Sequence, residues 1–191
     1  MCSYSRLILT TAIMLAAWPA AAQTGSVEVK SPDGSLAISV ATLAGVTPAA
    51  GGGQLAYQVT LRGKAVMDWS RLGLEIQGGP TLGAQVKILS AERSSHDEKW
   101  PALHGKANSI RDHYNAATIR TAESGRSGRL LNLEVRAYDD GVAFRYLVPE
   151  QPSIREMRLS AEATQFRASK DATTYPLILR DYRSSYEDDY H

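Results

Sequence analysis

The chain has 191 residues, about the length of one domain, with 21 basic and 20 acidic side chains and a single cysteine. A formal net charge of +1 provides no basic surface for binding phosphates, so the composition argues against a nucleic-acid-binding protein. Beyond the first segment, no hydrophobic run is long enough to anchor the chain in a membrane.

Residues 1–22 are predicted to be a secretory signal peptide that is cleaved after Ala22. Arg6 precedes a short, interrupted apolar run, and three alanines that end at Ala22 provide the small residues of a cleavage site. Cys2 would leave with this segment, so the mature chain would have no disulfide. We therefore expect a periplasmic or secreted protein that is stabilised by burial alone and has no membrane anchor after cleavage.

Short runs of alternating apolar and polar residues, separated by turn residues, follow the signal segment. Turns are predicted at Pro32-Asp33-Gly34 and Arg62-Gly63-Lys64. Strands are predicted around Val27–Val29, Leu36–Val40, Leu55–Leu61, Ala65–Met67, Leu72–Ile76, Val86–Leu89, Thr118–Thr121, Met157–Leu159 and Phe166. With no convincing amphipathic helix, the pattern predicts an all-β sandwich of about ten short strands.

The clearest supersecondary element is a β-hairpin within Leu130–Pro149. Asp140-Gly141 is predicted to be its two-residue loop, because glycine tolerates the positive φ of a type I′ turn. A loop at Asp139-Asp140 would keep the same face buried. In the first register Arg136 lies opposite Arg145, which is unfavourable, so we expect carboxylates close to this pair.

Between Ser94 and Ala116 the alternation fails, and this polar stretch contains three of the four histidines. Its aromatic and hydrogen-bonding side chains suit sugar recognition, because aromatic faces stack on sugar C–H surfaces and polar groups bind hydroxyls. The candidate residues are Trp100, His113, Tyr114 and Asn115. The alternative is a long ordered connection in which Trp100 fills the edge of the sandwich and a histidine caps a turn.

The C-terminal segment from Tyr182 to His191 is acidic and aromatic. Carboxylates at this density, Glu187 among them, are ligands that a hard cation such as calcium prefers. A solvated acidic chain end is the alternative interpretation.

Five motifs in order resemble the N-terminal domain of glycoside hydrolase family 97, the α-glucosidases and α-galactosidases of bacterial polysaccharide utilisation. They are Ser31-Pro32-Asp33-Gly34, Leu72-Gly73-Leu74-Glu75, Asp97-Glu98-Lys99-Trp100, His113-Tyr114-Asn115 and Tyr138 to Tyr146. The chain departs from the family pattern at Ala116, where the family tends to have Glu. It also departs at Trp100 and Pro101, which are adjacent in this sequence, whereas the family usually has one residue between them.

The resemblance implies a galactose-mutarotase-like β-super-sandwich over residues 23–191 that packs against a (β/α)8 barrel. In the family the barrel carries the two catalytic carboxylates, and one Glu of the N-terminal domain helps to bind calcium. Glu187 best matches that Glu, whereas His113, Tyr114 and Asn115 match a segment near the barrel interface or the pocket. The implied ligand is an α-glucoside or α-galactoside.

The resemblance also implies that the sandwich is incomplete at its C-terminus, because the family's domain normally runs further and the barrel follows it. We therefore expect the chain by itself to be inactive, with unpaired strand edges. Two other interpretations stay open from the sequence: a stand-alone periplasmic carbohydrate-binding module, and a structural β-sandwich without a ligand.

Overall fold

The computed structural model describes residues 25–45, 47–48, 51–125, 128–173 and 175, and this part of the chain contains strands and no helix. The strands are β1 (Ser26–Lys30), β2 (Leu36–Ala44), β3 (Thr47–Pro48), β4 (Gln54–Leu61), β5 (Lys64–Arg71), β6 (Leu74–Ile76), β7 (Val86–Pro101), β8 (Ser109–Glu123), β9 (Leu130–Ala137), β10 (Val142–Leu147) and β11 (Leu159–Glu162). Within the described residues, therefore, nothing forms a helix that could span a membrane.

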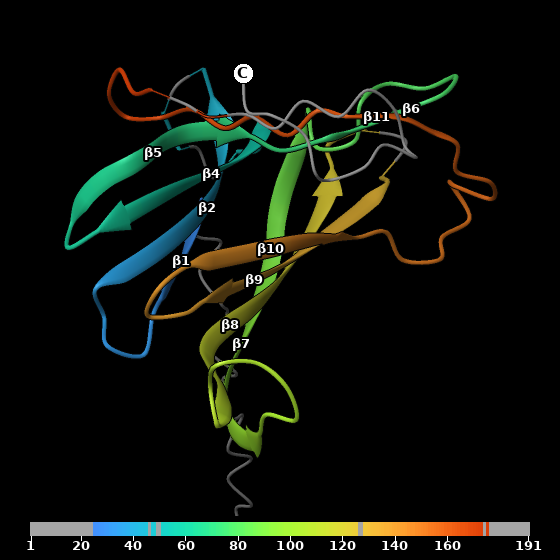
Figure 1. Cartoon of the computed structure of the whole chain (residues 1–191). Helices are drawn as coiled ribbons and strands as arrows, with labels where there is room; N and C mark the ends of the chain where they lie inside the picture. The colour runs from blue at the N-terminus through green and yellow to red at the C-terminus, as the bar shows by residue number, and fades with distance from the viewer. Residues whose placement is uncertain (1–24, 46, 49–50, 126–127, 174, 176–191) are drawn as a thin grey trace, which may run out of the picture.

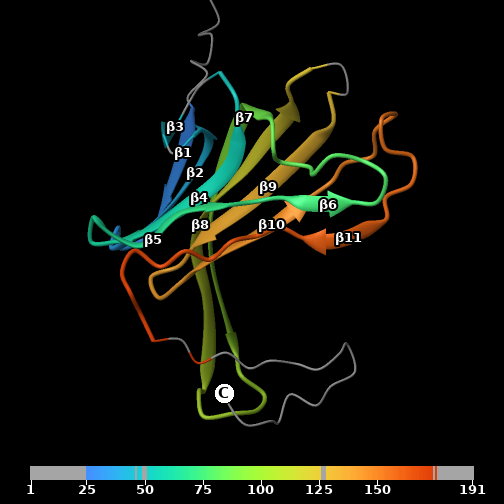
Figure 2. The same cartoon turned by 90° about the horizontal axis from the view of Figure 1, so that it is seen from above.

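The strands form two main antiparallel sheets that face each other, which Figures 1 and 2 show from two directions. The first sheet has the order β1-β2-β4-β5, with β3 paired to β2, and the second has the order β10-β9-β8-β7. A separate two-stranded sheet joins β6 and β11. The predicted all-β sandwich is confirmed.

The core lies between the inner faces of the two main sheets. The burial of β9 alternates residue by residue, as expected for a strand with one face against a core. Leu133 and Val135 from β9 meet Ile38 and Val40 from β2 in one apolar cluster, and all four side chains are fully buried. Burial of this kind is the main source of stability in a chain without a disulfide in its described part.

Both predicted turns are confirmed. The amide of Gly34 donates to the carbonyl of Ser31 at 2.9 Å, and Gly34 has a φ of 73° that a glycine adopts without strain. Arg62 and Gly63 have φ values of 51° and 76°. Two consecutive positive values match the type I′ geometry that follows the twist of a hairpin.

The predicted register of the β9–β10 hairpin is wrong, and the alternative with Asp139-Asp140 as the loop is correct. The amide of Tyr138 donates to the carbonyl of Gly141 at 2.8 Å, so these two residues flank the loop, and Gly141 has no positive φ. Arg145 lies opposite Glu134 and not opposite Arg136. This register removes the repulsion between the two arginines.

A carboxylate lies next to both arginines, as expected. Glu134 accepts hydrogen bonds from Arg136 at 3.0 Å and from Arg145 at 2.8 Å. Asp139 also has a tertiary role, because its carboxylate accepts a 2.9 Å hydrogen bond from the amide of Asp33 in the β1–β2 turn. These contacts favour the observed Asp139-Asp140 loop over an Asp140-Gly141 loop, in which glycine would adopt a positive φ.

The polar stretch from Ser94 to Ala116 is not an irregular connection. Most of it belongs to β7 and β8, whose pairing continues out to Pro101 opposite Ser109. Alternation fails there because both faces are largely exposed, so no buried face selects apolar residues.

The segment after β11 differs from the prediction for Phe166. It forms no strand of its own but lies beside β5, with a single bridge between Met67 and Ala168. Leu159 does begin a strand, β11, as predicted. The predicted signal peptide and the acidic segment with Glu187 lie outside the described residues.

Candidate functional site

The most prominent feature outside the sandwich is the outer part of the β7–β8 hairpin, residues 95–101 and 109–115, which we call the ribbon. Strand β9 pairs with β8 only as far as Asn115, opposite Ala137, whereas β7 and β8 continue to pair beyond that point. Figures 1 and 2 show the ribbon extending away from both sheets. At about 3.3 Å per residue, it extends roughly 20 Å.

An ion pair holds the two strands of the ribbon together. Arg111 donates from Nε and Nη2 to the two carboxylate oxygens of Asp97, each at 2.7 Å. This bidentate bond from Arg111 lowers the pKa of Asp97 from 3.8 to about 2. The same bond raises the pKa of Arg111. The ribbon therefore carries a fixed charge pair where it has no third strand to support it.

The predicted residues His113, Tyr114 and Asn115 are consecutive in β8 and so do not share a face. His113 and Asn115 lie on the face directed toward β1, and Tyr114 lies on the opposite face. The hydrogen bond of Asn115 to β1 and the ring contacts of Tyr114 with β7 and β9 residues agree with this placement.

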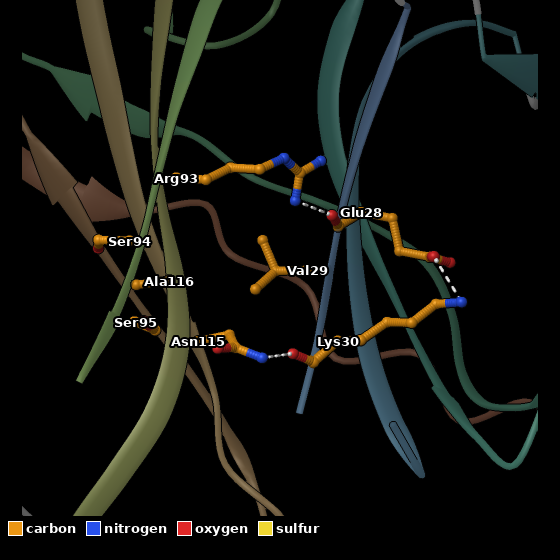
Figure 3. A pocket seen from close by; sticks show the side chains of 8 residues that line it. All are labelled: Glu28, Val29, Lys30, Arg93, Ser94, Ser95, Asn115 and Ala116. Carbon is orange, nitrogen blue, oxygen red and sulfur yellow. Dashed lines mark hydrogen bonds and ion pairs between the residues drawn. The ribbon is translucent and has the colours of Figure 1, made fainter. Parts of the chain in front are cut away.

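The face directed toward β1 closes the edge of the sandwich. Asn115 donates from Nδ2 to the carbonyl of Lys30 at 2.9 Å, and Arg93 donates to the carbonyl of Glu28 at 2.6 Å. Figure 3 shows both bonds between β1 and the strands at the base of the ribbon. The residues that make them line an open hollow of about 660 Å³. Two side chains thus bind the outward carbonyls of an edge strand, which would otherwise stay unpaired.

On the opposite face, Tyr114 is the centre of an aromatic and cationic cluster. Its ring lies 5.2 Å from the ring of His96 and 5.1 Å from that of Tyr138, measured between centroids. The guanidinium carbon of Arg136 lies 4.4 Å from the centroid of Tyr114, a cation–π contact. Nε2 of His96 also lies 3.4 Å from a carboxylate oxygen of Glu98. These contacts fix the orientation of the Tyr114 ring.

Sequence reasoning missed His96 and Arg136, both of which contact Tyr114. The alternation in β9 does predict that the Arg136 side chain points away from the core, and β9 lies beside β8. Its contact with Tyr114 depends on the β8–β9 register, which no local pattern specifies.

Trp100 lies at the far end of the ribbon, opposite Ile110. It is 40% exposed, and Leu103 in the connecting loop is 88% exposed, so it does not fill an edge of the sandwich in the described structure. Trp100 is four residues from His96, the neighbour of Tyr114, which corresponds to about 13 Å along a strand. The four predicted sugar-binding residues therefore share one ribbon but no single pocket within the described residues.

The described residues include no group of three or more His, Cys, Asp or Glu side chains that could bind a metal ion. His96, Glu98 and Asp112 come nearest in composition, with His96 3.4 Å and 3.7 Å from the two carboxylates. Glu187, the predicted calcium ligand, is outside the described part. The donor set seen here therefore does not fit calcium.

A family model described as Glycosyl-hydrolase 97 N-terminal matches residues 29–191. A retaining alpha-galactosidase of Bacteroides thetaiotaomicron is 30% identical over 117 residues, which are 61% of this chain and 15% of that protein. A probable retaining alpha-galactosidase of Streptomyces bingchenggensis is 32% identical over 123 residues, covering 64% and 18%.

Solved structures also match this chain. A glycoside hydrolase family 97 enzyme from Pseudoalteromonas sp. strain K8, in complex with acarbose, has a TM-score of 0.67 and 25% identity and matches 75% of this chain. A beta-arabinopyranosidase has a TM-score of 0.63 and 25% identity over 74% of the chain. The chain covers only 20% and 21% of these two structures, so most of each protein lies outside the match.

Proposed function

The chain belongs to the glycosyl-hydrolase 97 N-terminal family, and from this premise we propose that it is the carbohydrate-facing β-sandwich domain of an α-glycosidase. The substrate in this proposal is an α-galactoside or an α-glucoside. The names of the sequence relatives, two retaining alpha-galactosidases, support the first. A similar structure in complex with panose supports the second.

Catalysis is assigned to a second domain, a (β/α)8 barrel that packs against this one. Hydrolysis of a glycoside needs two carboxyl groups on either side of the scissile bond, about 5 to 9.5 Å apart depending on the stereochemical outcome. The proposal places both on the barrel, so this chain by itself is inactive. This assignment is supported by coverage, because the chain matches only 15% and 18% of the length of the two sequence relatives and most of each relative lies outside the match.

The single observation that supports a role in substrate binding is the ribbon. It presents Trp100 and His113 outside both sheets, on strands fixed by the Asp97–Arg111 ion pair and by Asn115 at the base. Trp100 offers an apolar ring on which a sugar can stack, and the His113 imidazole makes no hydrogen bond to another described residue. Tyr114 and Asn115, whose side chains point to opposite faces of β8, hold this strand in place through their contacts with neighbouring strands.

Calcium binding through Glu187 is a separate part of the proposal. One carboxylate is not a site, because calcium takes six to eight oxygen ligands, so the remaining ligands would come from the barrel. Millimolar calcium is then expected to leave the melting temperature of this chain unchanged. It would raise that of a two-domain enzyme, and Glu187→Gln would reduce the increase. A calcium-dependent increase in the isolated chain would contradict this assignment.

Export is the third part of the proposal, with cleavage after Ala22 and accumulation in the periplasm or the medium. N-terminal sequencing of the exported protein is then expected to begin at Gln23. An intact Met1 on a cytoplasmic protein would contradict it.

The test replaces the N-terminal domain of the Bacteroides relative with this chain and measures hydrolysis of 4-nitrophenyl α-galactoside and α-glucoside. The chain alone is expected to hydrolyse neither, and the chimera at least one. Trp100→Ala is expected to raise KM about tenfold or more, because it removes the ring on which the sugar stacks, and His113→Ala is expected to raise KM by less, because His113 lies on the other face of the ribbon.

Lys106→Ala is the matched control, since Lys106 is exposed in the loop of the same ribbon and makes no ion pair in the described structure. Its KM is expected to equal that of the parent chimera. Equal KM values for all three variants would contradict substrate contact by the ribbon. Hydrolysis by the chain alone would contradict the assignment of catalysis to a barrel.

A further inference from the structure

The outer face of the first sheet carries a small apolar cluster that is separate from the core. Ala41 on β2 and Ala56 on β4 are cross-strand neighbours, and both are fully buried although they point away from the sandwich interior. Trp69 on β5 packs against this pair and against Leu43. An indole over two alanines forms a flat, supported aromatic surface on the outside of the protein.

A β-bulge directs Trp69 to this face. Val59 pairs with Met67 and Tyr57 pairs with Ser70, so β5 advances three residues while β4 advances two. Met67 and Ser70 both point inward, toward the core, and the extra residue places Trp69 outside. Bulges re-aim side chains in this way and are over-represented next to functional sites.

A segment from the far end of the described chain completes the surroundings of Trp69. Residues 165–169, which we call the strap, lie along the outer edge of β5 (Figures 1 and 2). The amide of Asp68 donates to the carbonyl of Arg167 at 2.8 Å, and the amide of Gln165 donates to the carbonyl of Arg71 at 2.9 Å. The backbone bonds hold the strap in place. The Gln165 side chain accepts a 3.5 Å hydrogen bond from the amide of Arg71 through Oε1, which leaves its Nε2 for another contact, and the Arg167 side chain makes no hydrogen bond within the described residues.

Strap, bulge and indole together line an open hollow of about 560 Å³, with Trp69, Asp68, Arg71, Gln165 and Arg167 around it. Asp68 forms no ion pair with either arginine among the described residues, although the charges are opposite. Its carboxylate and the two guanidinium groups are therefore available to an incoming ligand. An aromatic surface beside a carboxylate, an amide and two guanidinium groups offers a face on which a pyranose ring can stack and polar groups that can hydrogen-bond its hydroxyls.

We propose that this outer-face hollow binds a pyranose unit of a polysaccharide, stacked on Trp69, with its hydroxyls hydrogen-bonded to Asp68, Gln165 and Arg167. The site lies on the outer face of the first sheet, whereas the ribbon extends from the second, so the two are separate places on the molecule. The site would hold a polymer against the protein. This inference does not require the function proposed for the ribbon.

The experiment is affinity electrophoresis of the full chain in native gels that contain dissolved glycogen, galactomannan or polygalacturonate. Retardation is expected in at least one gel, and the three gels distinguish α-glucose, α-galactose and uronic acid units. Trp69→Ala is expected to weaken binding at least tenfold, and Trp69→Phe by less, because phenylalanine keeps a smaller aromatic surface.

Trp69→Ala also exposes Ala41 and Ala56 and could destabilise the fold, so a second variant is needed to separate lost binding from misfolding. Arg167→Ala leaves the backbone bonds of the strap intact and is expected to weaken retardation several-fold with an unchanged melting temperature. Lys106→Ala, in the exposed loop of the ribbon, is expected to migrate like the parent chain. Trp100→Ala distinguishes the two sites, because it would abolish retardation only if the ribbon bound the polysaccharide in the gel.

Three outcomes would overturn the proposal. The first is the absence of retardation in every gel, and the second is parent-like retardation of both Trp69→Ala and Arg167→Ala. The third is loss of retardation in Trp100→Ala alone, which would assign the binding to the ribbon. None of these outcomes bears on the KM values of the chimera, so the two proposals fail separately.

Discussion

The sandwich and the ribbon are built from the same secondary structure but rest on different interactions. In the sandwich, β9 has one face against the opposite sheet, and its inward side chains are fully buried. In the ribbon, β7 and β8 pair only with each other beyond Asn115, and their side chains are exposed or half-buried on both faces. The comparison shows that strand pairing alone leaves a segment dependent on a few side-chain contacts, whereas burial stabilises a sheet throughout.

The largest expected difference concerns apolar side chains. Leu133→Ala is expected to lower the free energy of unfolding by about 2 to 5 kcal/mol, because Leu133 is fully buried and its loss leaves a cavity. Leu103→Ala, at the tip of the ribbon, is expected to change it by less than about 0.5 kcal/mol. Urea denaturation of both variants measures the difference. A cost at Leu103 equal to that at Leu133 would mean that the tip is packed against something in solution.

Two bidentate Arg–carboxylate pairs allow the same comparison for charge. Arg129 and Glu123 lie in the sandwich with side chains 9% and 7% exposed, and Arg129 donates to both carboxylate oxygens at 2.6 Å. Glu123→Gln is expected to cost about 3 kcal/mol, because it leaves a guanidinium buried without its counter-charge. The equivalent change in the ribbon, Asp97→Asn, is expected to leave the urea midpoint unchanged, since water solvates the exposed Arg111. Equal midpoint shifts would refute the distinction.

The junction between the two regions is expected to show an intermediate effect. Asn115→Ala removes the hydrogen bond to the carbonyl of Lys30 and should cost about 1 kcal/mol. Hydrogen exchange should quicken in β1 and at the base of the ribbon while β9 stays protected. Asn132→Ala, on the outer face of β9, is the control. Unchanged exchange in β1 would show that Asn115 does not hold the edge of the sandwich.

The smallest effect is a local pH dependence in the ribbon. The folded-state pKa of Asp97 is about 2, below the ordinary 3.8, because of the bond from Arg111. A lowered folded-state pKa means that the ion pair supports the ribbon fully above about pH 4 and is lost as the pH falls toward 2. NMR titration of the Asp97 carboxyl carbon should give a midpoint near 2, and Arg111→Ala should return it to near 3.8. A midpoint near 3.8 in the parent chain would mean that the pair does not form.

The hairpin at the centre of the second sheet shows how far local sequence rules reach. The alternation identified the buried face correctly, because a strand against a core must alternate. The loop position was wrong by one residue, because the rule that glycine marks the turn ignores tertiary contacts. Glu134 between two arginines and the bond from Asp33 to Asp139 favour the other register.

The sequence indicated candidate residues for a site but not their arrangement in space. The sequence singled out Trp100 and His113 to Asn115 by composition, and all lie on one projecting element. The sequence predicted no strand between Ser94 and Ala116, because apolar and polar residues do not alternate there. It therefore could not place Tyr114 and Asn115 on opposite faces of a strand. Partners such as Arg136 were also out of reach, since they come from a neighbouring strand.

By itself, the sequence determined the fold class, most of the strands and the family, because periodicity, turn residues and motifs are local properties of the chain. Tertiary structure decided the hairpin register, the extension of the ribbon beyond the sheet and the position of Trp69 outside the sandwich. Each of these depends on contacts between residues far apart in sequence, such as the strap beside β5 or Asn115 on β1. Such contacts leave no periodic signal, because each involves single residues on elements whose relative position only folding establishes.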